Sequence, residues 1–427
     1  MSRDTIFALS SGRPPAAISV IRISGPRAHA AGEAIAGELP GARQAGVREL
    51  RHPANGELLD EALVLRFDAP ASSTGEDIVE FQCHGGRAVV DAVLSALTAV
   101  EGLRFAQPGE FTRRAFESGR IDLTEAEGLA DLIEAETESQ RKAALALAEG
   151  GLRRQIEIWQ GQVLVLSARA EQAIDYVGEG EAEEVGVLSR DCAALATELR
   201  EWLERPRAEP LKDGIRAVVA GPPNAGKSSL INAIAGTDRA IVTDIPGTTR
   251  DHIDVPLALS GLPLLLTDTA GLRDTDDRVE LMGVQRAQAL VERADILVWL
   301  GDPEKVVEHG RTILVHAKAD LPGRDEAPAG SIAVSSVTGG GIDQLLRRIE
   351  AMAKSILPAE DALSLNRRQA GHVEEAEAAL SDAAGSADLI LIAESLRAAR
   401  QAFDRLTGRA GIEDVLDALF GRFCLGK

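Results

Sequence analysis

The sequence predicts a multidomain protein that combines α/β parts with an all-α part. Three observations predict this fold class. Short apolar runs separated by Gly, Pro and Ser occupy residues 1–118, apolar residues recur at spacings of three and four in two helical stretches, and strand-like runs alternate with helical patterns over residues 212–357. A chain of 427 residues also exceeds what one hydrophobic core normally serves, so several domains are expected.

The N-terminal part, residues 1–118, is predicted to be a small mixed α/β domain. Its strand-like runs are Ile18–Ile23, Ala62–Phe67 and Ile78–Cys83. Clusters of turn-forming residues separate these runs, which favours a sheet with short connections.

Amphipathic helices are predicted on both sides of the central part, in residues 119–211 and 358–427. The apolar positions of these helices are Leu152, Ile156, Trp159, Val163 and Leu166, then Leu188, Cys192, Leu195, Leu199 and Trp202, and finally Ile392, Leu396, Ala399, Phe403 and Leu406. Single apolar stripes are stable only when they are buried against one another, so the two segments are expected to form one discontinuous helical domain. The acidic segment Gly178–Glu184 is interpreted as a solvated hairpin loop, with metal binding as the less favoured alternative.

The central part, residues 212–357, is predicted to be inserted into this helical domain. Its apolar runs are Ala217–Ala220, Leu264–Leu266, Ile296–Leu300, Ile313–Val315 and Ile332–Val334. Because helical patterns alternate with these runs, we expect a parallel-type sheet with helices on both faces.

Composition limits the functions open to the chain. The formal net charge of −21 argues against a broad basic face for nucleic acid, so an RNA partner would need a local patch. Cys83, Cys192 and Cys424 lack Cys-x-x-Cys spacing, which argues against disulfides and structural zinc, and Cys83 and Cys192 are assigned to packing. No apolar run approaches the ~20 residues of a membrane span, and no signal peptide is evident, so we expect a cytoplasmic protein without a membrane partner.

A phosphate-binding loop is predicted directly after the strand Ala217–Ala220. Gly221–Ser228 has the pattern Gly-x4-Gly-Lys-Ser in the strand-loop-helix setting that its chemistry requires. The glycines let backbone amides surround phosphates, Lys227 supplies a cation, and the Ser228 hydroxyl can ligate Mg²⁺. The residues expected to contact nucleotide here are Asn224, Ala225, Gly226, Lys227, Ser228 and Ser229.

Three further motifs follow in the order found in GTPases. Asp268-Thr269-Ala270-Gly271 follows a strand; Asp268 is expected to hold Mg²⁺ through water, and the Gly271 amide to meet the γ-phosphate. Ala317-Lys318-Ala319-Asp320 directly follows the strand Ile313–His316, and Asp320 can accept two hydrogen bonds from guanine that adenine cannot donate. Ala317 stands where the guanine motif usually has Asn, which removes one polar tether. The last guanine-contacting loop is assigned to Ser335 and Ser336.

The segment Thr243–Asp251 lies between the phosphate-binding loop and Asp268–Gly271, and it is rich in hydroxyl side chains. We interpret it as a switch in which Thr249 is the second Mg²⁺ ligand, with a plain surface turn as the alternative. Its predicted nucleotide contacts are Thr243, Asp244, Ile245, Pro246, Gly247, Thr248 and Thr249. Leu272 occupies the place where Ras-like enzymes have the glutamine that orients the attacking water, so another group must do so.

Several separate segments resemble one protein family over essentially the entire chain. These segments are Arg22–Gly25, Gly75–Gly86, Gly109–Ala115, Leu123–Ile133, Asp244–Asp251 and the terminal Phe423–Lys427. On them the sequence is similar to the MnmE (TrmE) family of tRNA modification GTPases. The resemblance implies a folate-binding and dimerisation domain at 1–118, a helical domain at 119–211 and 358–427, and a Ras-like GTPase domain at 212–357.

The resemblance also implies a reaction and partners. Family members hydrolyse GTP to GDP and phosphate, form homodimers, and assemble as a heterotetramer with the FAD-dependent protein MnmG. Together they add a carboxymethylaminomethyl or aminomethyl group to carbon 5 of the wobble uridine of certain tRNAs. A 5-formyl- or 5,10-methylene-tetrahydrofolate supplies the one-carbon unit, and the matching folate-binding positions are Arg22, Glu80, Arg120 and Lys427. The family usually has lysine where Arg120 stands.

Hydrolysis in the family is activated by K⁺. The matching K⁺ ligands are the Asn224 side chain, the Thr243 and Ile245 carbonyls and the Thr248 hydroxyl, and Glu280 matches the water-orienting glutamate. Cys424 has two interpretations: a nucleophilic or redox role in the uridine chemistry, or a place in a structural lid over the folate site.

Two other functions are compatible with the nucleotide motifs alone. A ribosome-assembly or signalling GTPase could act purely as a binding switch, although Arg22, Glu80 and the Cys424–Lys427 tail would then have no task. A dimeric scaffold could bind GTP and hydrolyse little of it, and Ala317 lends this alternative slight support.

Overall fold

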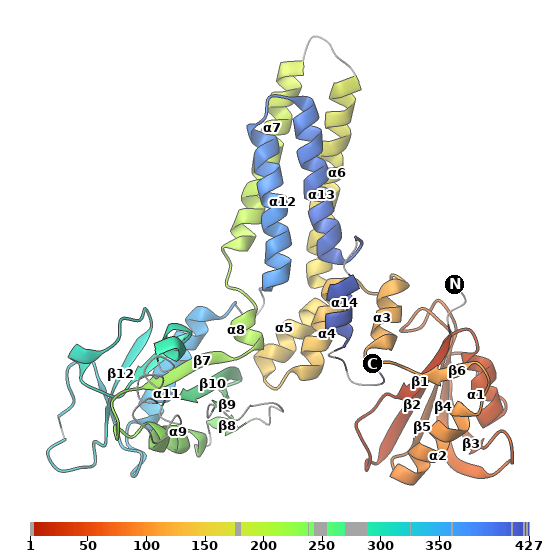
Figure 1. The fold of residues 1–427 in the computed structure, drawn as a ribbon, viewed down its shortest axis with the longest axis horizontal. Helices are drawn as coiled ribbons and strands as arrows, with labels where there is room; N and C mark the ends of the chain where they lie inside the picture. The colour runs from red at the N-terminus through yellow and green to blue at the C-terminus, as the bar shows by residue number, and fades with distance from the viewer. Residues whose placement is uncertain are drawn as a thin grey trace, which may run out of the picture. The chain divides into compact units, whose positions relative to one another are not determined.

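A computed structural model of the protein shows two compact units (Figure 1). It describes residues 4–175, 181–237, 239–242, 254–269, 288–324, 326–359, 362–410, 413–421, 423 and 426. One unit joins Met1–Ala130 to Thr407–Lys427, and the other comprises Asp131–Leu406. Among the described helices, none combines the length and the apolar character that crossing a membrane requires.

A six-stranded sheet forms the centre of the first unit. In spatial order its strands are β3 (Ala45–Arg51), β4 (Leu58–Phe67), β5 (Ile78–His84), β2 (Ile18–Ser24), β1 (Thr5–Leu9) and β6 (Leu103–Phe105). Only the β1–β6 pair is parallel. The three predicted strands are confirmed within β2, β4 and β5. The other three strands were not predicted; they are β1, β3, in which charged residues are mixed with uncharged ones, and the very short β6.

Helices α1 (Ala28–Ala36) and α2 (Arg87–Thr98) cover one face of this sheet. Their apolar sides share a core with strand residues such as Phe7, Ile21 and Phe81, all fully buried. Elsewhere in this unit, α3 (Glu110–Glu117) and the start of α4 (Leu123–Glu134) share a smaller core with the C-terminal helix α14 (Glu413–Phe420).

Four long helices form the helical part of the second unit. They are α6 (Gly151–Asp175), α7 (Glu181–Leu203), α12 (Arg367–Gly385) and α13 (Leu389–Thr407), and they run side by side in Figure 1. The predicted apolar stripes are buried against one another in a single core, as expected. Trp159 lies at its centre, stacked on Phe403 with ring centroids 5.8 Å apart and edge-on to Trp202 at 5.2 Å.

The predicted loop Gly178–Glu184 is only partly a loop. Helix α7 already begins at Glu181, so the loop interpretation is wrong for Glu181–Glu184, while Gly178–Gly180 lie outside the described residues. Arg169 of α6 pairs with Glu184 at 2.7 Å, which explains how an acidic helix start can be stabilised.

A seven-stranded sheet forms the inserted part of the second unit. In spatial order its strands are β13 (Ile332–Val334), β12 (Thr312–Ala317), β11 (Ile296–Trp299), β7 (Ile215–Ala220), β10 (Leu262–Asp268), β9 (Asp254–Leu259) and β8 (Ala240–Val242). Helices α9 (Lys227–Ala235) and α11 (Ile342–Ile356) bury their apolar sides on one face, and Val291 from the helical segment 288–292 packs on the other. The predicted fold class is confirmed.

One strand of this sheet departs from the parallel arrangement. The strands from β13 to β10 pair in parallel, whereas β9 pairs antiparallel with both β10 and β8. The cause is the tight turn Ser260–Gly261, in which φ is +51° and +82°, because two positive φ angles suit a two-residue hairpin.

Candidate functional site

The predicted phosphate loop lies between β7 and α9. Two glycines are required by its path: Gly221 has φ +150°, and a Cβ there would lie 2.6 Å from the Leu300 carbonyl oxygen, while Gly226 has φ +100° at the N-cap of α9. Asn224 also has a positive φ of +60°. The loop therefore turns tightly at the N-terminus of a helix, where backbone N–H groups are available to an anion.

Lys227, the first residue of α9, is held inside this loop. Its side chain is buried, and Nζ donates to the carbonyl oxygens of Gly221 and Pro222, both at 3.0 Å. The ammonium group thus lies across the loop, at the position where it can neutralise phosphate oxygens.

Two oxygen ligands meet beside Lys227. The Ser228 hydroxyl donates to Asp268 Oδ2 at 2.5 Å, and Asp268 is buried at the end of β10. Hydroxyl and carboxylate oxygens are the ligands that Mg²⁺ prefers, so these residues fit a magnesium site. The next residue, Thr269, donates from Oγ1 to the Val219 carbonyl at 3.1 Å, which fixes the start of the following loop on β7.

The predicted base-binding loops lie at the same edge of the sheet. Lys318 follows β12, and its Nζ donates to the Asn224 carbonyl at 2.7 Å, which connects this loop to the phosphate loop. Asp320 is exposed two residues later. Ser335 follows β13 and is buried; its hydroxyl accepts the amides of Val337 and Thr338 at 3.2 and 3.1 Å. Parallel strands place their carboxyl ends together, so these loops can share one ligand.

Other predicted site residues lie outside the described residues. They are Thr243, Asp244, Ile245, Pro246, Gly247, Thr248, Thr249, Ala270, Gly271, Glu280, Cys424 and Lys427. Their roles remain predictions.

A second candidate site is a cavity of about 410 Å³ in the first unit. Arg22 and Arg120 both line it, together with Ser10, Thr74 and Phe111. Arg22 Nε donates to Glu80 Oε1 at 2.7 Å, and its guanidinium carbon lies 5.6 Å from the centre of the Phe111 ring. Three of the four residues predicted to bind folate are thus close together, and the cavity has the size of a small-molecule site.

Gly426 lies against a residue that lines this cavity. A Cβ on Gly426 would lie 1.9 Å from the Leu9 carbonyl oxygen and 2.9 Å from Cα of Ser10, one of the lining residues. Only glycine permits this approach, and its φ of +96° is one that glycine adopts readily. Ser10 and Thr74 could not be found from the sequence, because isolated residues from separate elements form no motif, whereas Phe111 lies in the segment Gly109–Ala115 that carries the family resemblance.

Known proteins resemble the chain over its whole length. The family model described as "MnmE helical domain" matches residues 123–424, and that described as "GTP-binding protein TrmE N-terminus" matches residues 5–120. The tRNA modification GTPase MnmE of Novosphingobium aromaticivorans is 51% identical over 99% of this chain and 100% of its own length. The chain belongs to the MnmE family.

Further MnmE proteins agree with this assignment. The tRNA modification GTPase MnmE of Zymomonas mobilis is 50% identical over 99% of this chain and all of its own length, and that of Erythrobacter litoralis is 50% identical with the same coverage. Among solved structures, the G domain of the T. maritima FeoB iron transporter covers 33% of this chain at 25% identity, with a TM-score of 0.25, too low to bear on function.

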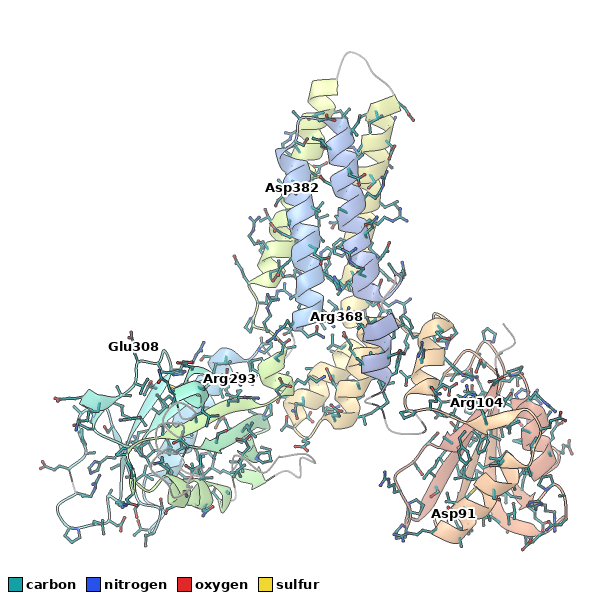
Figure 2. All side chains as sticks on the ribbon, in the orientation of Figure 1. Asp91, Arg104, Arg293, Glu308, Arg368 and Asp382 are labelled. Atoms are coloured by element: carbon teal, nitrogen blue, oxygen red, sulfur yellow. The ribbon has the colours of Figure 1, made fainter. Side chains whose placement is uncertain are left out.

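A buried ionic cluster supports the cavity of this MnmE protein. Arg114 of α3 donates to Glu76 and to Glu110, each at 3.0 Å, and to the Asp4 carbonyl at 2.8 Å. Arg104, marked in Figure 2, pairs with Glu110 at 2.6 Å. Because Glu76 and α3 flank the lining residues Thr74 and Phe111, the cluster fixes two walls of the cavity.

Replacing Glu110 by glutamine should make stability depend less on pH. Burial alone would raise the pKa of Glu110, but hydrogen bonds from Arg104, the Gln107 amide and Arg114 lower it from 4.5 to about 2. The ionised carboxylate therefore stabilises the fold above pH 4.5, and this contribution is lost as the pH falls towards 2. We expect Glu110→Gln to melt about 3–6 °C lower at neutral pH, with a difference that shrinks between pH 4.5 and 2 in thermal scans. A difference independent of pH would contradict this.

Burial keeps two of the cysteines in the thiol form. Cys83 and Cys192 are buried, and burial raises the pKa of Cys83 to about 12 and that of Cys192 to about 11. Neither supplies a thiolate near neutral pH, which agrees with their assignment to packing.

Proposed function

We propose that this chain hydrolyses GTP to GDP and phosphate, in a magnesium-dependent reaction. The observation that carries the proposal is the phosphate loop with Lys227 buried across it, beside the Ser228–Asp268 pair. Family membership supports the same reaction, because the relatives are named tRNA modification GTPases.

The residues of the site have separate tasks in this proposal. The amides of the loop from Asn224 to Ser229, together with Lys227, bind and orient the phosphates. Ser228, Thr249 and Asp268 would hold Mg²⁺, and the ion would neutralise charge on the phosphate oxygens. The remaining nucleotide contacts are assigned to Thr243–Thr249, Asp268–Gly271, Lys318, Asp320, Ser335 and Ser336.

We assign selection of the base to Asp320. Its carboxylate can accept from both the ring N–H and the amino group of guanine, whereas adenine presents an acceptor at the ring position. The Lys318 contact to the Asn224 carbonyl supports this assignment, because it ties the base loop to the phosphate loop.

We propose K⁺ and Glu280 as the remaining parts of the hydrolytic machinery. The Asn224 side chain, the Thr243 and Ile245 carbonyls and the Thr248 hydroxyl would hold K⁺, which offsets charge in the transition state. Glu280 would orient the attacking water, because Leu272 occupies the place where Ras-like enzymes have the glutamine that does so. Of this set the structure describes Asn224, which lies in the phosphate loop and offers the oxygen ligand that K⁺ needs.

Turnover should depend on the monovalent cation. We expect hydrolysis in potassium chloride to be at least about tenfold faster than in sodium chloride at equal ionic strength, because the ion acts only as charge develops. Phosphate release measured in the two salts tests this, with Glu280→Ala as a variant that should be slow in both. Equal rates in the two salts would reject the K⁺ role, and a fully active Glu280→Ala enzyme would reject the role of Glu280.

We further propose that the chain modifies tRNA. A 5-formyl- or 5,10-methylene-tetrahydrofolate would bind Arg22, Glu80, Arg120 and Lys427, and the cavity that Arg22 and Arg120 line supports this. The chain would form a homodimer and assemble as a heterotetramer with the FAD-dependent MnmG protein in the cytoplasm. This assembly would add a carboxymethylaminomethyl or aminomethyl group to the wobble uridine.

Cys424 is assigned to that chemistry, with a place in a structural lid over the folate site as the alternative. Mass analysis of wobble nucleosides from cells lacking the protein tests the proposal: unchanged nucleosides would refute it.

A further inference from the structure

The β9–β10 hairpin extends from the nucleotide motifs to the helical part of the second unit. β9 begins at Asp254, just after the predicted switch, and β10 ends at Asp268. The two strands pair from Asp254 opposite Thr267 to Leu259 opposite Leu262. The open end of the hairpin therefore lies at the nucleotide site, and its turn lies about 20 Å away.

The open end of the hairpin is fastened by a side-chain hydrogen bond. Thr267 is buried and donates from Oγ1 to Asp254 Oδ1 at 2.6 Å. The next residue, Asp268, accepts from Ser228 at 2.5 Å. A displacement of either nucleotide motif therefore moves both strands together.

The turn of the hairpin is fastened to helix α5 (Glu138–Ala148). The Gly261 carbonyl accepts the Ser139 hydroxyl at 2.7 Å and the Ser139 amide at 3.4 Å. On the other side of the turn, the Ser260 hydroxyl donates to Glu350 of α11 at 3.2 Å. The turn thus connects the inserted part to the first turn of a helix outside it.

The start of α5 is held by hydrogen bonds of its own. Thr137 caps the helix in a capping box with Gln140, and Gln140 Nε2 donates to the Lys212 carbonyl at 3.1 Å, where the chain enters the inserted part. Ser139 lies between these two residues and cannot follow the hairpin without moving the helix start.

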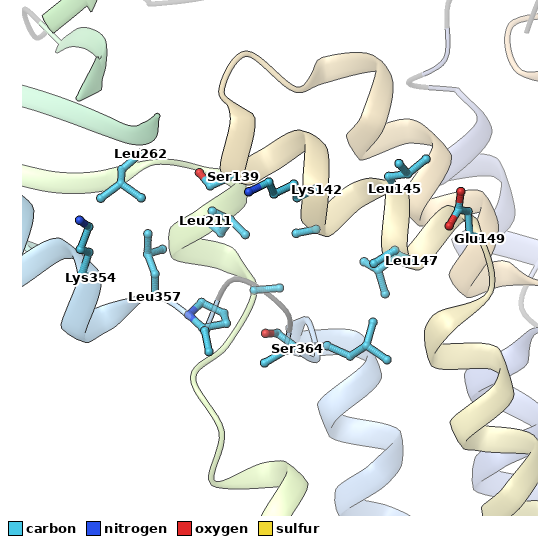
Figure 3. A pocket seen from close by; sticks show the side chains of 17 residues that line it. Ser139, Lys142, Leu145, Leu147, Glu149, Leu211, Leu262, Lys354, Leu357 and Ser364 are labelled. Carbon is cyan, nitrogen blue, oxygen red and sulfur yellow. The ribbon is translucent and has the colours of Figure 1, made fainter. Parts of the chain in front are cut away.

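A cavity of about 540 Å³ lies beside this connection (Figure 3). Ser139 and Leu147 line it from α5, Leu262 from β10, and Leu357 from the end of α11. Interiors are normally close-packed, so this space interrupts the packing between the hairpin turn, α5 and the end of α11. At the edge of this space, the hydrogen bonds of Ser139 join the hairpin turn directly to α5.

We propose that Ser139 is a positioning residue that couples the nucleotide at Asp268 to helix α5 through the β9–β10 hairpin. This inference rests on the proposed GTPase function. The coupling would run from the nucleotide motifs along the hairpin to the Gly261 carbonyl, and from there through Ser139 to α5. Because coupling is reciprocal, a change in α5 also alters nucleotide binding by the same factor.

Hydrogen exchange in the full-length protein tests the proposal. Peptides covering residues 138–148 are followed with GDP and with a non-hydrolysable GTP analogue, both with Mg²⁺ and K⁺. In the parent protein we expect the exchange rate of α5 to differ about fivefold between the two nucleotides, the effect of one ordinary hydrogen bond. Ser139→Ala should abolish this difference, and Ser139→Thr, which keeps the hydroxyl, should retain it.

Ser364→Ala is the matched control. Ser364 is buried and lines the same cavity from a different segment, so this variant should respond like the parent. The ratio of the affinities for GDP and for the GTP analogue, measured separately, should change by no more than about fivefold in Ser139→Ala, the same factor by which the nucleotides act on α5. Equal melting temperatures of the alanine variants would exclude a loss of fold as the cause.

Two results would overturn the proposal. One is a parent protein that binds both nucleotides while α5 exchanges at the same rate with each; the other is a Ser139→Ala variant that retains the parent's difference. If the parent binds neither nucleotide, the proposed GTPase function fails, and the coupling fails with it.

Discussion

Replacing Lys227 by alanine is expected to lower kcat/KM for GTP by at least about 1,000-fold. The ammonium group is buried and bridges the carbonyls of Gly221 and Pro222, so it is already positioned where phosphate charge must be neutralised. Alanine removes this cation and also takes the Nζ donor away from the two carbonyls. Phosphate release with Mg²⁺ and K⁺ measures the loss.

Lys354→Ala provides the control for this variant. Lys354 is an exposed lysine on α11 that pairs with Glu350 at 2.8 Å, and its removal should change kcat/KM less than about twofold. A Lys227→Ala protein that keeps more than a tenth of the parent activity would show that the loop does not bind the phosphates as described.

Asp320→Asn is expected to change which base the protein binds. The carboxylate is matched to two guanine donors, and an amide at this position presents one donor and one acceptor instead. We expect GTP affinity to fall at least about 100-fold, and affinity for xanthosine triphosphate, which carries an oxygen where guanine has an amino group, to rise. Competition against a fluorescent nucleotide measures both.

Asp343→Asn is the control for the Asp320→Asn variant. Asp343 is an exposed carboxylate in the first turn of α11, so its replacement should leave both affinities unchanged. If Asp320→Asn binds GTP as tightly as the parent, guanine is selected by other residues.

Features that depend on neighbours in sequence were predictable. The phosphate loop follows a strand and begins a helix, so its eight-residue pattern already contains most of its geometry. The helical stripes were predictable for the same reason: Trp159 and Leu396 lie at fixed spacings from their neighbours, and burial of one stripe requires another.

Features that depend on distant residues were not predictable. The strand order places β11 beside β7 although about 75 residues separate them in the chain, and Glu184 near the start of α7 pairs with Arg169 of α6. The cavity beside Arg22 is assembled from single residues on several elements, and the Arg114 cluster that supports it has no periodicity. Likewise, the hydrogen bond from Ser139 to the Gly261 carbonyl could not be predicted, because neither residue belongs to a recognisable pattern.

Equilibrium binding of GTP and ATP to the purified full-length protein with Mg²⁺ tests the central claim most directly. If guanine nucleotide occupies the loop around Lys227 and is selected at Asp320, GTP should bind at least about 100-fold more tightly than ATP. Equal or tighter binding of ATP, or no binding of either nucleotide, would contradict the account.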